Sequence, residues 1–146
     1  MLWALGVARE TLRGSHPHQN VTEKHHHYKR WFKNLRSGIQ ARDADFSNAN
    51  VAGADFVAAK LQAANFSGVN AANAEFTEAD MHDALLVDAD VTNATLDQAR
   101  LQDADLTGVI LLDAELVGAT LYDVLLNNAD LRGADFSDSS LKRVSA

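Results

Sequence analysis

Residues 44–68 read ADFSN-ANVAG-ADFVA-AKLQA-ANFSG, five consecutive groups of five residues built on one pattern. The pattern continues without a slip to residue 143, which makes twenty groups. The first position is Ala in sixteen groups, Val in three and Ser in one, and the third position is always apolar. A unit this short cannot bury an apolar face alone, so the sequence predicts that successive units wind and stack as a solenoid.

A period of five matches neither the 3.6-residue helix nor the two-residue strand. We interpret each unit as three extended residues and a turn. The first and third residues point inward and the second points outward, whereas the fourth and fifth lie outside and are rich in turn-forming residues. The large third residues predict the central stack, which includes Phe46, Phe56, Phe66, Phe76, Leu96, Leu116 and Phe136.

The repeat resembles that of the pentapeptide-repeat family, whose signature is A-(D/N)-(L/F)-x-x. The resemblance covers 100 of the 146 residues. It implies an all-β solenoid, a right-handed quadrilateral β-helix with twenty residues per coil, so that twenty units make about five coils. At about 4.8 Å per coil the body would be about 24 Å tall.

Residues 1–43 differ in charge from the rest of the chain. They hold eight Lys or Arg against three Asp or Glu, whereas residues 44–146 hold five against seventeen. The sequence thus predicts three parts: a basic arm over 1–43 with an amphipathic α-helix near 20–37, the repeat body over 44–143, and a short tail over 144–146. The apolar face of that helix would consist of Tyr28, Trp31, Phe32, Leu35 and Ile39, which follow helical spacing. The helix would cap the first coil; alternatively, the arm binds an anionic partner.

One outward column is acidic in the expected register. Its second-position residues are Asp55, Glu75, Thr95, Glu115 and Asp135, and Glu78, Asp97 and Asp138 lie beside them. This focused acidic strip supports the second of the two functions considered below, the imitation of DNA.

Outward apolar residues gather in the later coils. They are Leu85, Val87, Ile110, Leu112, Val117, Tyr122 and Leu125. A cluster of this kind on an acidic rod predicts a contact surface for a partner or a second copy. We expect Ile110, Leu112 and Leu125 to be at least half exposed in the isolated chain.

The sequence shows no pattern that supports catalysis. It has no Cys, no Gly-rich phosphate loop and no nucleophile–base arrangement. The consecutive histidines 25–27 would point about 100° apart on a helix and would not converge on one metal ion. We therefore predict no enzyme activity, no catalytic residue, no metal and no cofactor.

Two functions remain. The first is a non-catalytic protein–protein interaction or scaffold module, such as a small subunit or assembly factor, that binds other proteins or itself through the apolar patch or the edge of the last coil. The second follows from the family resemblance: some members mimic DNA, bind DNA gyrase and confer quinolone resistance. Direct nucleic-acid binding is not expected, because the acidic body repels phosphate. No apolar run reaches membrane-span length, so we expect a soluble protein, cytoplasmic or, alternatively, thylakoid- or plastid-associated.

Overall fold

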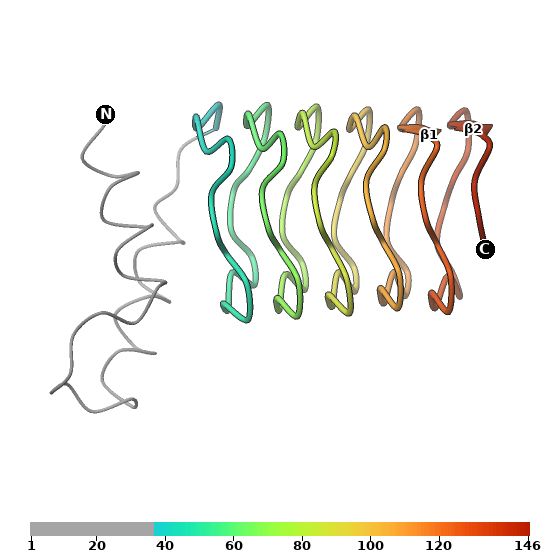
Figure 1. The fold of residues 1–146 in the computed structure, drawn as a ribbon, viewed down its shortest axis with the longest axis horizontal. Coiled ribbons are helices and arrows are strands. Elements are labelled where there is room, and N and C mark those ends of the chain that lie inside the picture. The colour runs from blue at the N-terminus through green and yellow to red at the C-terminus, as the bar shows by residue number, and fades with distance from the viewer. Residues whose placement is uncertain (1–36) are drawn as a thin grey trace, which may run out of the picture.

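The computed structural model describes residues 37–146. They form one stack of coils in which each residue at a bridging position pairs in parallel with the residue twenty positions later, from Gln40↔Lys60 to Leu125↔Ser145. Two stretches are long enough to count as strands, β1 (Thr120–Tyr122) and β2 (Ser140–Lys142), and they pair in the same register. The coils stack along one axis (Figure 1), and the predicted solenoid period of twenty is confirmed.

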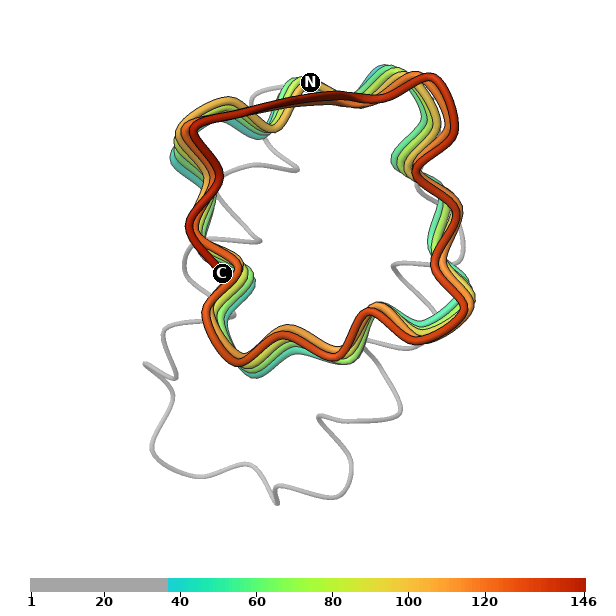
Figure 2. The ribbon, with the colours of Figure 1, turned by 90° about the vertical axis from the view of Figure 1, so that its right-hand side faces the viewer.

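Each coil has four sides (Figure 2). Seen from the C-terminal end, the chain turns anticlockwise as it approaches the viewer, so the superhelix is right-handed. We name the sides by their second-position residues. Face A carries residues 45, 65, 85, 105, 125 and 145; face B carries 50, 70, 90, 110 and 130; face C carries 55, 75, 95, 115 and 135; and face D carries 40, 60, 80, 100, 120 and 140.

The hydrogen bonds explain why five residues make one side. In the unit Ala64–Gly68, the Asn65 amide donates to the Ala44 carbonyl one coil before, and the Phe66 amide donates to the Leu85 carbonyl one coil after. The Val69 amide then donates back to the Phe66 carbonyl and closes a β-turn. The fifth residue of every unit from Asp43 to Arg143 has a positive φ, which the third residue of a type II turn requires.

Asp and Asn at the second position serve the same turn. The Asp45 Oδ1 atom accepts the Ser47 amide at 3.0 Å, and Asn65 Oδ1 accepts the Ser67 amide at 2.9 Å. Seven further units repeat this bond, with acceptors Asn50, Asp55, Asn70, Asp90, Asp105, Asp130 and Asp135. A short side chain that accepts the backbone amide two residues later in the chain forms an Asx turn. Asp or Asn at the second position of the repeat therefore stabilises the turn of its own unit.

The small first residues and large third residues fill the axis. Phe46 stacks on Phe66 with ring centroids 4.7 Å apart, and Phe56 stacks on Phe76 at 4.9 Å. Leu96 and Leu116 continue the second stack and are fully buried, whereas Phe136 in the last coil is partly buried because less of the solenoid covers it.

The solenoid begins before its expected start. Gln40 bridges Lys60, the Ile39 carbonyl accepts the Lys60 amide, and Ile39 packs against the core as the first residue of a unit. The assignment of Ile39 to a helical cap is therefore wrong, as is the boundary at residue 44. Tyr28, Trp31, Phe32 and Leu35 lie outside the described residues. Within 37–146 there is no helix, hence none long and apolar enough to cross a membrane.

The end of the repeat also lies later than expected. Ser145 bridges Leu125, and Val144 packs against the core. Residues 144–146 thus continue the solenoid and do not form a separate tail.

Candidate interaction surfaces

Face C brings the predicted acidic strip together. Parallel bridges join Asp55 to Glu75, Glu75 to Thr95, Thr95 to Glu115 and Glu115 to Asp135, so the five residues form one column. Glu78, Asp97 and Asp138 occupy the fourth and fifth positions of the same side. Face C thus holds seven carboxylates, and between residues 37 and 146 it holds no Lys or Arg.

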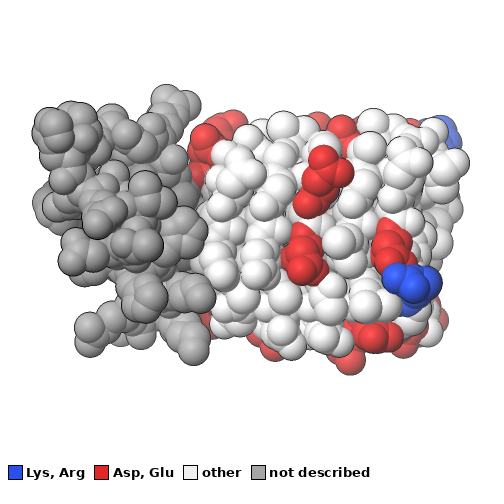
Figure 3. All heavy atoms as spheres, turned by 90° about the horizontal axis from the view of Figure 1, so that it is seen from below, with Lys and Arg blue, Asp and Glu red and all other residues white. Residues whose placement is uncertain are grey.

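The other sides differ. Five of the six Lys and Arg residues in 37–146 lie on face D: Arg42, Lys60, Arg100, Lys142 and Arg143. Five carboxylates accompany them, so face D is neutral overall. The side of the solenoid shown in Figure 3 carries scattered acidic groups and little positive charge. The negative charge of the body is therefore concentrated on face C.

Asp55 and Asp135, at the two ends of the face C column, are held in place by local hydrogen bonds. Asp55 Oδ1 accepts the Val57 amide at 2.9 Å, and Asp135 Oδ1 accepts the amide and hydroxyl of Ser137 at 2.8 and 2.5 Å. These hydrogen bonds from Ser137 lower the pKa of Asp135, so it stays ionised. Glu75 and Glu115 are exposed and project from the same column.

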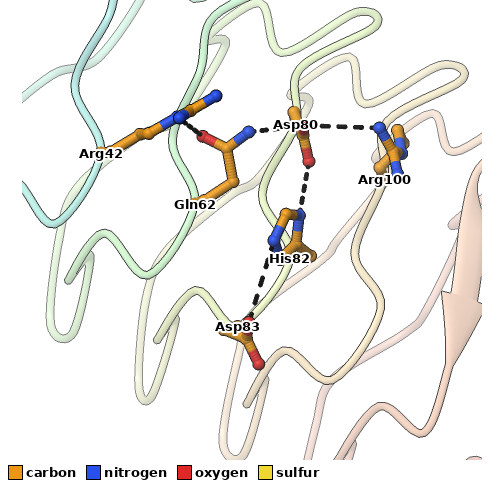
Figure 4. Close-up of polar contacts among 6 residues, drawn as sticks. All are labelled: Arg42, Gln62, Asp80, His82, Asp83 and Arg100. Atoms are coloured by element: carbon orange, nitrogen blue, oxygen red, sulfur yellow. Dashed lines mark hydrogen bonds and ion pairs between the residues drawn. The ribbon is translucent and has the colours of Figure 1, made fainter.

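Face D contains a polar network centred on Asp80 (Figure 4). Asp80 is 5% exposed and is the one buried charged residue among residues 37–146. Its Oδ2 atom accepts a hydrogen bond from the side-chain amide of Gln62 at 2.6 Å and lies 3.4 Å from the Arg100 guanidinium. Its Oδ1 atom lies 2.8 Å from Nδ1 of His82. Arg42 donates a hydrogen bond to Oε1 of Gln62 at 2.9 Å. The network therefore ties four successive coils together.

Burial alone would raise the pKa of Asp80. The hydrogen bond from His82, the charge of Arg100 and the hydrogen bond from Gln62 outweigh that effect and hold the pKa below its ordinary value of 3.8. A carboxylate engaged through both oxygen atoms in this way stabilises the contacts between neighbouring coils.

The predicted apolar interface is divided among the four sides, although five of its seven residues lie on the adjoining faces A and B. Leu85, Val87 and Leu125 lie on face A, Ile110 and Leu112 on face B, Val117 on face C and Tyr122 on face D. The Tyr122 ring is approached by Lys142 Nζ of the next coil, 5.1 Å from its centroid.

The exposure expected for this interface was also wrong. Leu125 is 41% and Ile110 39% exposed, and Leu112 is less exposed still. Side chains one coil above and below, about 4.8 Å away, cover part of each residue.

Sequence reasoning missed two features. It did not identify the contact of His82 with Asp80, although an outward second residue and an outward fourth residue of one unit are close enough to bond. It also missed Leu141, a third-position residue that is 50% exposed in the last coil. The repeat register places Leu141 in the last coil and His82 beside Asp80, but it does not determine whether the two side chains of the pair turn toward each other.

The histidine runs of the arm lie outside the described residues. Within the solenoid, no group of three or more His, Asp or Glu side chains is arranged to hold a metal ion. Gln102 Oε1, on face D, is the one buried side-chain polar atom between residues 37 and 146 that has no hydrogen-bond partner.

Comparisons with known proteins agree with this architecture. The model of pentapeptide repeats matches the chain in eight copies, in overlapping segments from residue 37 to residue 145. A pentapeptide repeat protein from Nostoc PCC 7120 has a similar structure, with a TM-score of 0.50 and 26% identity over 87% of this chain and 99% of that one. No curated protein sequence matches the chain.

Two further solved structures are similar in fold. A pentapeptide repeat protein from the Arabidopsis thaliana thylakoid lumen is 28% identical, with a TM-score of 0.39 over 88% of this chain and 77% of that one. A trypsin-treated form of QnrB1, a plasmid-mediated fluoroquinolone resistance protein, is 19% identical, with a TM-score of 0.48 over 77% and 69%. These two likenesses concern the fold alone.

Proposed function

Because the chain belongs to the pentapeptide repeat family, we propose that it is a non-catalytic protein-binding module whose acidic face C docks a basic region of another protein. The observation that carries the proposal is the segregation of charge. Face C has seven carboxylates and no Lys or Arg among the described residues, whereas five of the six Lys and Arg residues there lie on face D.

The solenoid supports this role because it presents the charges on a rigid frame. The backbone of Glu75 is hydrogen-bonded to Ala54 and Phe56 of the preceding coil, and its neighbours Ala74 and Phe76 are hydrogen-bonded to Thr95 of the following coil. The charges therefore keep their spacing when a partner approaches, and little conformational entropy is lost on binding. An electrostatic surface of one sign also raises the association rate of an oppositely charged partner.

A non-catalytic role agrees with the state of the buried carboxylate. Asp80 is engaged by Gln62, His82 and Arg100 at once. General acid–base catalysis needs a titratable group within reach of a substrate and with a pKa near the working pH. The pKa of Asp80 is instead lowered below its ordinary value, so this carboxylate does not meet the requirement for a pKa near the working pH.

A second candidate is a DNA-mimicking protein that binds DNA gyrase, and the charge density of face C favours it. Four coil steps separate Asp55 from Asp135, about 19 Å at 4.8 Å per step. Seven carboxylates over that length give about one charge per 2.7 Å, compared with one per about 1.7 Å for duplex DNA. Face C thus approaches the linear charge density of a duplex.

Two measurements separate the candidates. Chemical cross-linking of the full-length protein in its native host, followed by mass spectrometry, identifies the proteins that contact face C. A DNA supercoiling assay with purified gyrase tests the mimic directly. Inhibition that weakens steeply with salt would support the DNA mimic, and no inhibition at micromolar protein would exclude it. Cross-links to partners through faces other than C would contradict the proposed role of the acidic face.

A further inference from the structure

Three large apolar side chains are exposed on two adjoining sides of the solenoid. Leu85 and Leu125 on face A are 42% and 41% exposed, and Ile110 on face B is 39% exposed. Val87 and Leu112 lie beside them and are partly buried. We call these five residues the A/B patch. Within the solenoid, the one further large apolar residue that is equally exposed is Leu141, in the last coil.

The surroundings of the A/B patch are acidic. Asp88 and Asp105 lie on face A, and Asp90, Asp113 and Asp130 lie on face B. The one Lys or Arg of these two faces within the described residues is Arg132. Its guanidinium is held by Asp130 through bonds of 2.8 and 2.6 Å, which leaves it poorly placed to repel a basic partner. A patch of this chemistry fits a segment that combines apolar or aromatic residues with Lys and Arg.

The chain itself contains such a segment. Residues 24–36 read KHHHYKRWFKNLR, with five Lys or Arg and no Asp or Glu. The same thirteen residues include Tyr28, Trp31, Phe32 and Leu35. Aromatic residues and Arg are the types that contribute most to the affinity of an interface. We propose that residues 24–36 of one copy bind the A/B patch of a second copy.

The chain path favours a second copy over the same one. Gly38 donates its amide to the Val57 carbonyl, so the chain joins the solenoid at the corner between faces C and D of the first coil. Ile110 lies on face B about three and a half coil steps further along, about 17 Å along the axis. The six residue steps from Phe32 to Gly38 span at most about 20 Å, which is too short to cover that rise and also pass around the intervening side, so Phe32, Leu35 and Arg36 cannot reach Ile110 of their own copy.

Reciprocal exchange would give a closed dimer. If each copy inserts its basic segment into the patch of the other, the two contacts are equivalent and the assembly stops at two chains. This surface is distinct from face C, so the inference stands independently of the proposed partner-binding role.

The test uses the full chain and three variants, with mass measured by sedimentation velocity over a range of concentrations. The patch variant is Ile110→Asp with Leu125→Asp. The matched control is Thr95→Asp with Thr120→Asp, which adds the same charge at the same repeat position on faces C and D. The segment variant is Trp31→Ala with Phe32→Ala. We expect the wild type and the control to dimerise, and the patch and segment variants to weaken dimerisation at least about tenfold.

A mixture of the two defective variants is the sharpest part of the test. The patch variant keeps an intact segment and the segment variant keeps an intact patch, so the mixture should restore a 1:1 complex that neither forms alone. A monomeric wild type, or a patch variant that dimerises like the control, would overturn the proposal. So would a segment variant that lowers the melting temperature without changing the mass, because its segment would then cap its own solenoid.

Discussion

Oδ1 of Asp80 lies 2.8 Å from Nδ1 of His82, the outward residue two positions later in the same side of the coil. The contact leaves the second carboxylate oxygen free for Gln62 of the preceding coil and Arg100 of the following one. His82 also reaches toward Asp83, with 3.9 Å between Nε2 and Oδ2. Polar side chains thus reinforce face D between coils, as apolar side chains do inside.

The Asp80 network should make stability depend on acid. Its pKa is lower in the folded protein than its ordinary value of 3.8, so its stabilising contribution is complete above that value and is lost as the pH falls through the folded-state pKa. We expect Asp80→Asn to cost about 1–3 kcal/mol at neutral pH and to flatten the decline in the free energy of unfolding below about pH 4. Urea unfolding across this range measures both. Asp83→Asn, which changes an exposed carboxylate, is the control; equal effects of the two variants would contradict the account.

Gly108 should tolerate a side chain less well than Gly53. Both have a positive φ, +69° and +66°, so Ala is strained equally at either. A Cβ atom at Gly108 would overlap the Asp88 carboxylate one coil before, whereas a Cβ at Gly53 meets nothing within 4 Å. We expect Gly53→Ala to cost about 1 kcal/mol and Gly108→Ala more. Thermal unfolding measures the difference, and adding Asp88→Ala should remove most of it; if it does not, the overlap is not the cause.

Burial along the axis should separate inward from outward positions. Leu116 is fully buried, so Leu116→Ala should lower the free energy of unfolding by about 2–5 kcal/mol. Asp97 Oδ1 accepts the Val117 amide one coil later, so Asp97→Ala should cost about 1 kcal/mol. Glu115→Gln, at an exposed position, should cost less than about 0.5 kcal/mol. Denaturant unfolding checks the order, and a different order would contradict the register.

The regular part of the fold could be predicted from sequence because one rule is repeated. Each unit has a small first residue, an apolar third residue and a turn, and one arrangement lets every unit bury its apolar side. The same register also predicted the acidic column that contains Asp55 and Glu75. The rule weakens at the ends, where a unit such as Ile39–Asp43 departs from the Ala-led pattern. Ile39 also satisfies helical spacing with Leu35, so pattern alone assigned it to the wrong element.

Contacts between outward side chains could not be predicted in the same way. Whether His82 turns toward Asp80, or Asp97 toward the Val117 amide, depends on side-chain rotamers and on the neighbouring coil rather than on the repeat letters. The exposed fraction of a side chain could not be predicted for the same reason. Ile110 occupies an outward position of the repeat, but the coils on either side determine how much of its side chain stays in contact with water.

The most direct test of the proposed role of face C is the affinity of a cross-linked partner for a charge variant. Asp55→Asn, Glu75→Gln, Glu115→Gln and Asp135→Asn remove four charges, and the Asn residues keep the turn bond that Asn50 and Asn65 make elsewhere. The control changes Asp45, Asp90, Asp105 and Asp130 to Asn, which removes as much charge from faces A and B. We expect the partner's dissociation constant, measured by titration calorimetry, to rise at least about tenfold for the face C variant and to change little for the control. Equal affinity of the face C variant and the wild type would contradict the claim that face C is the binding surface.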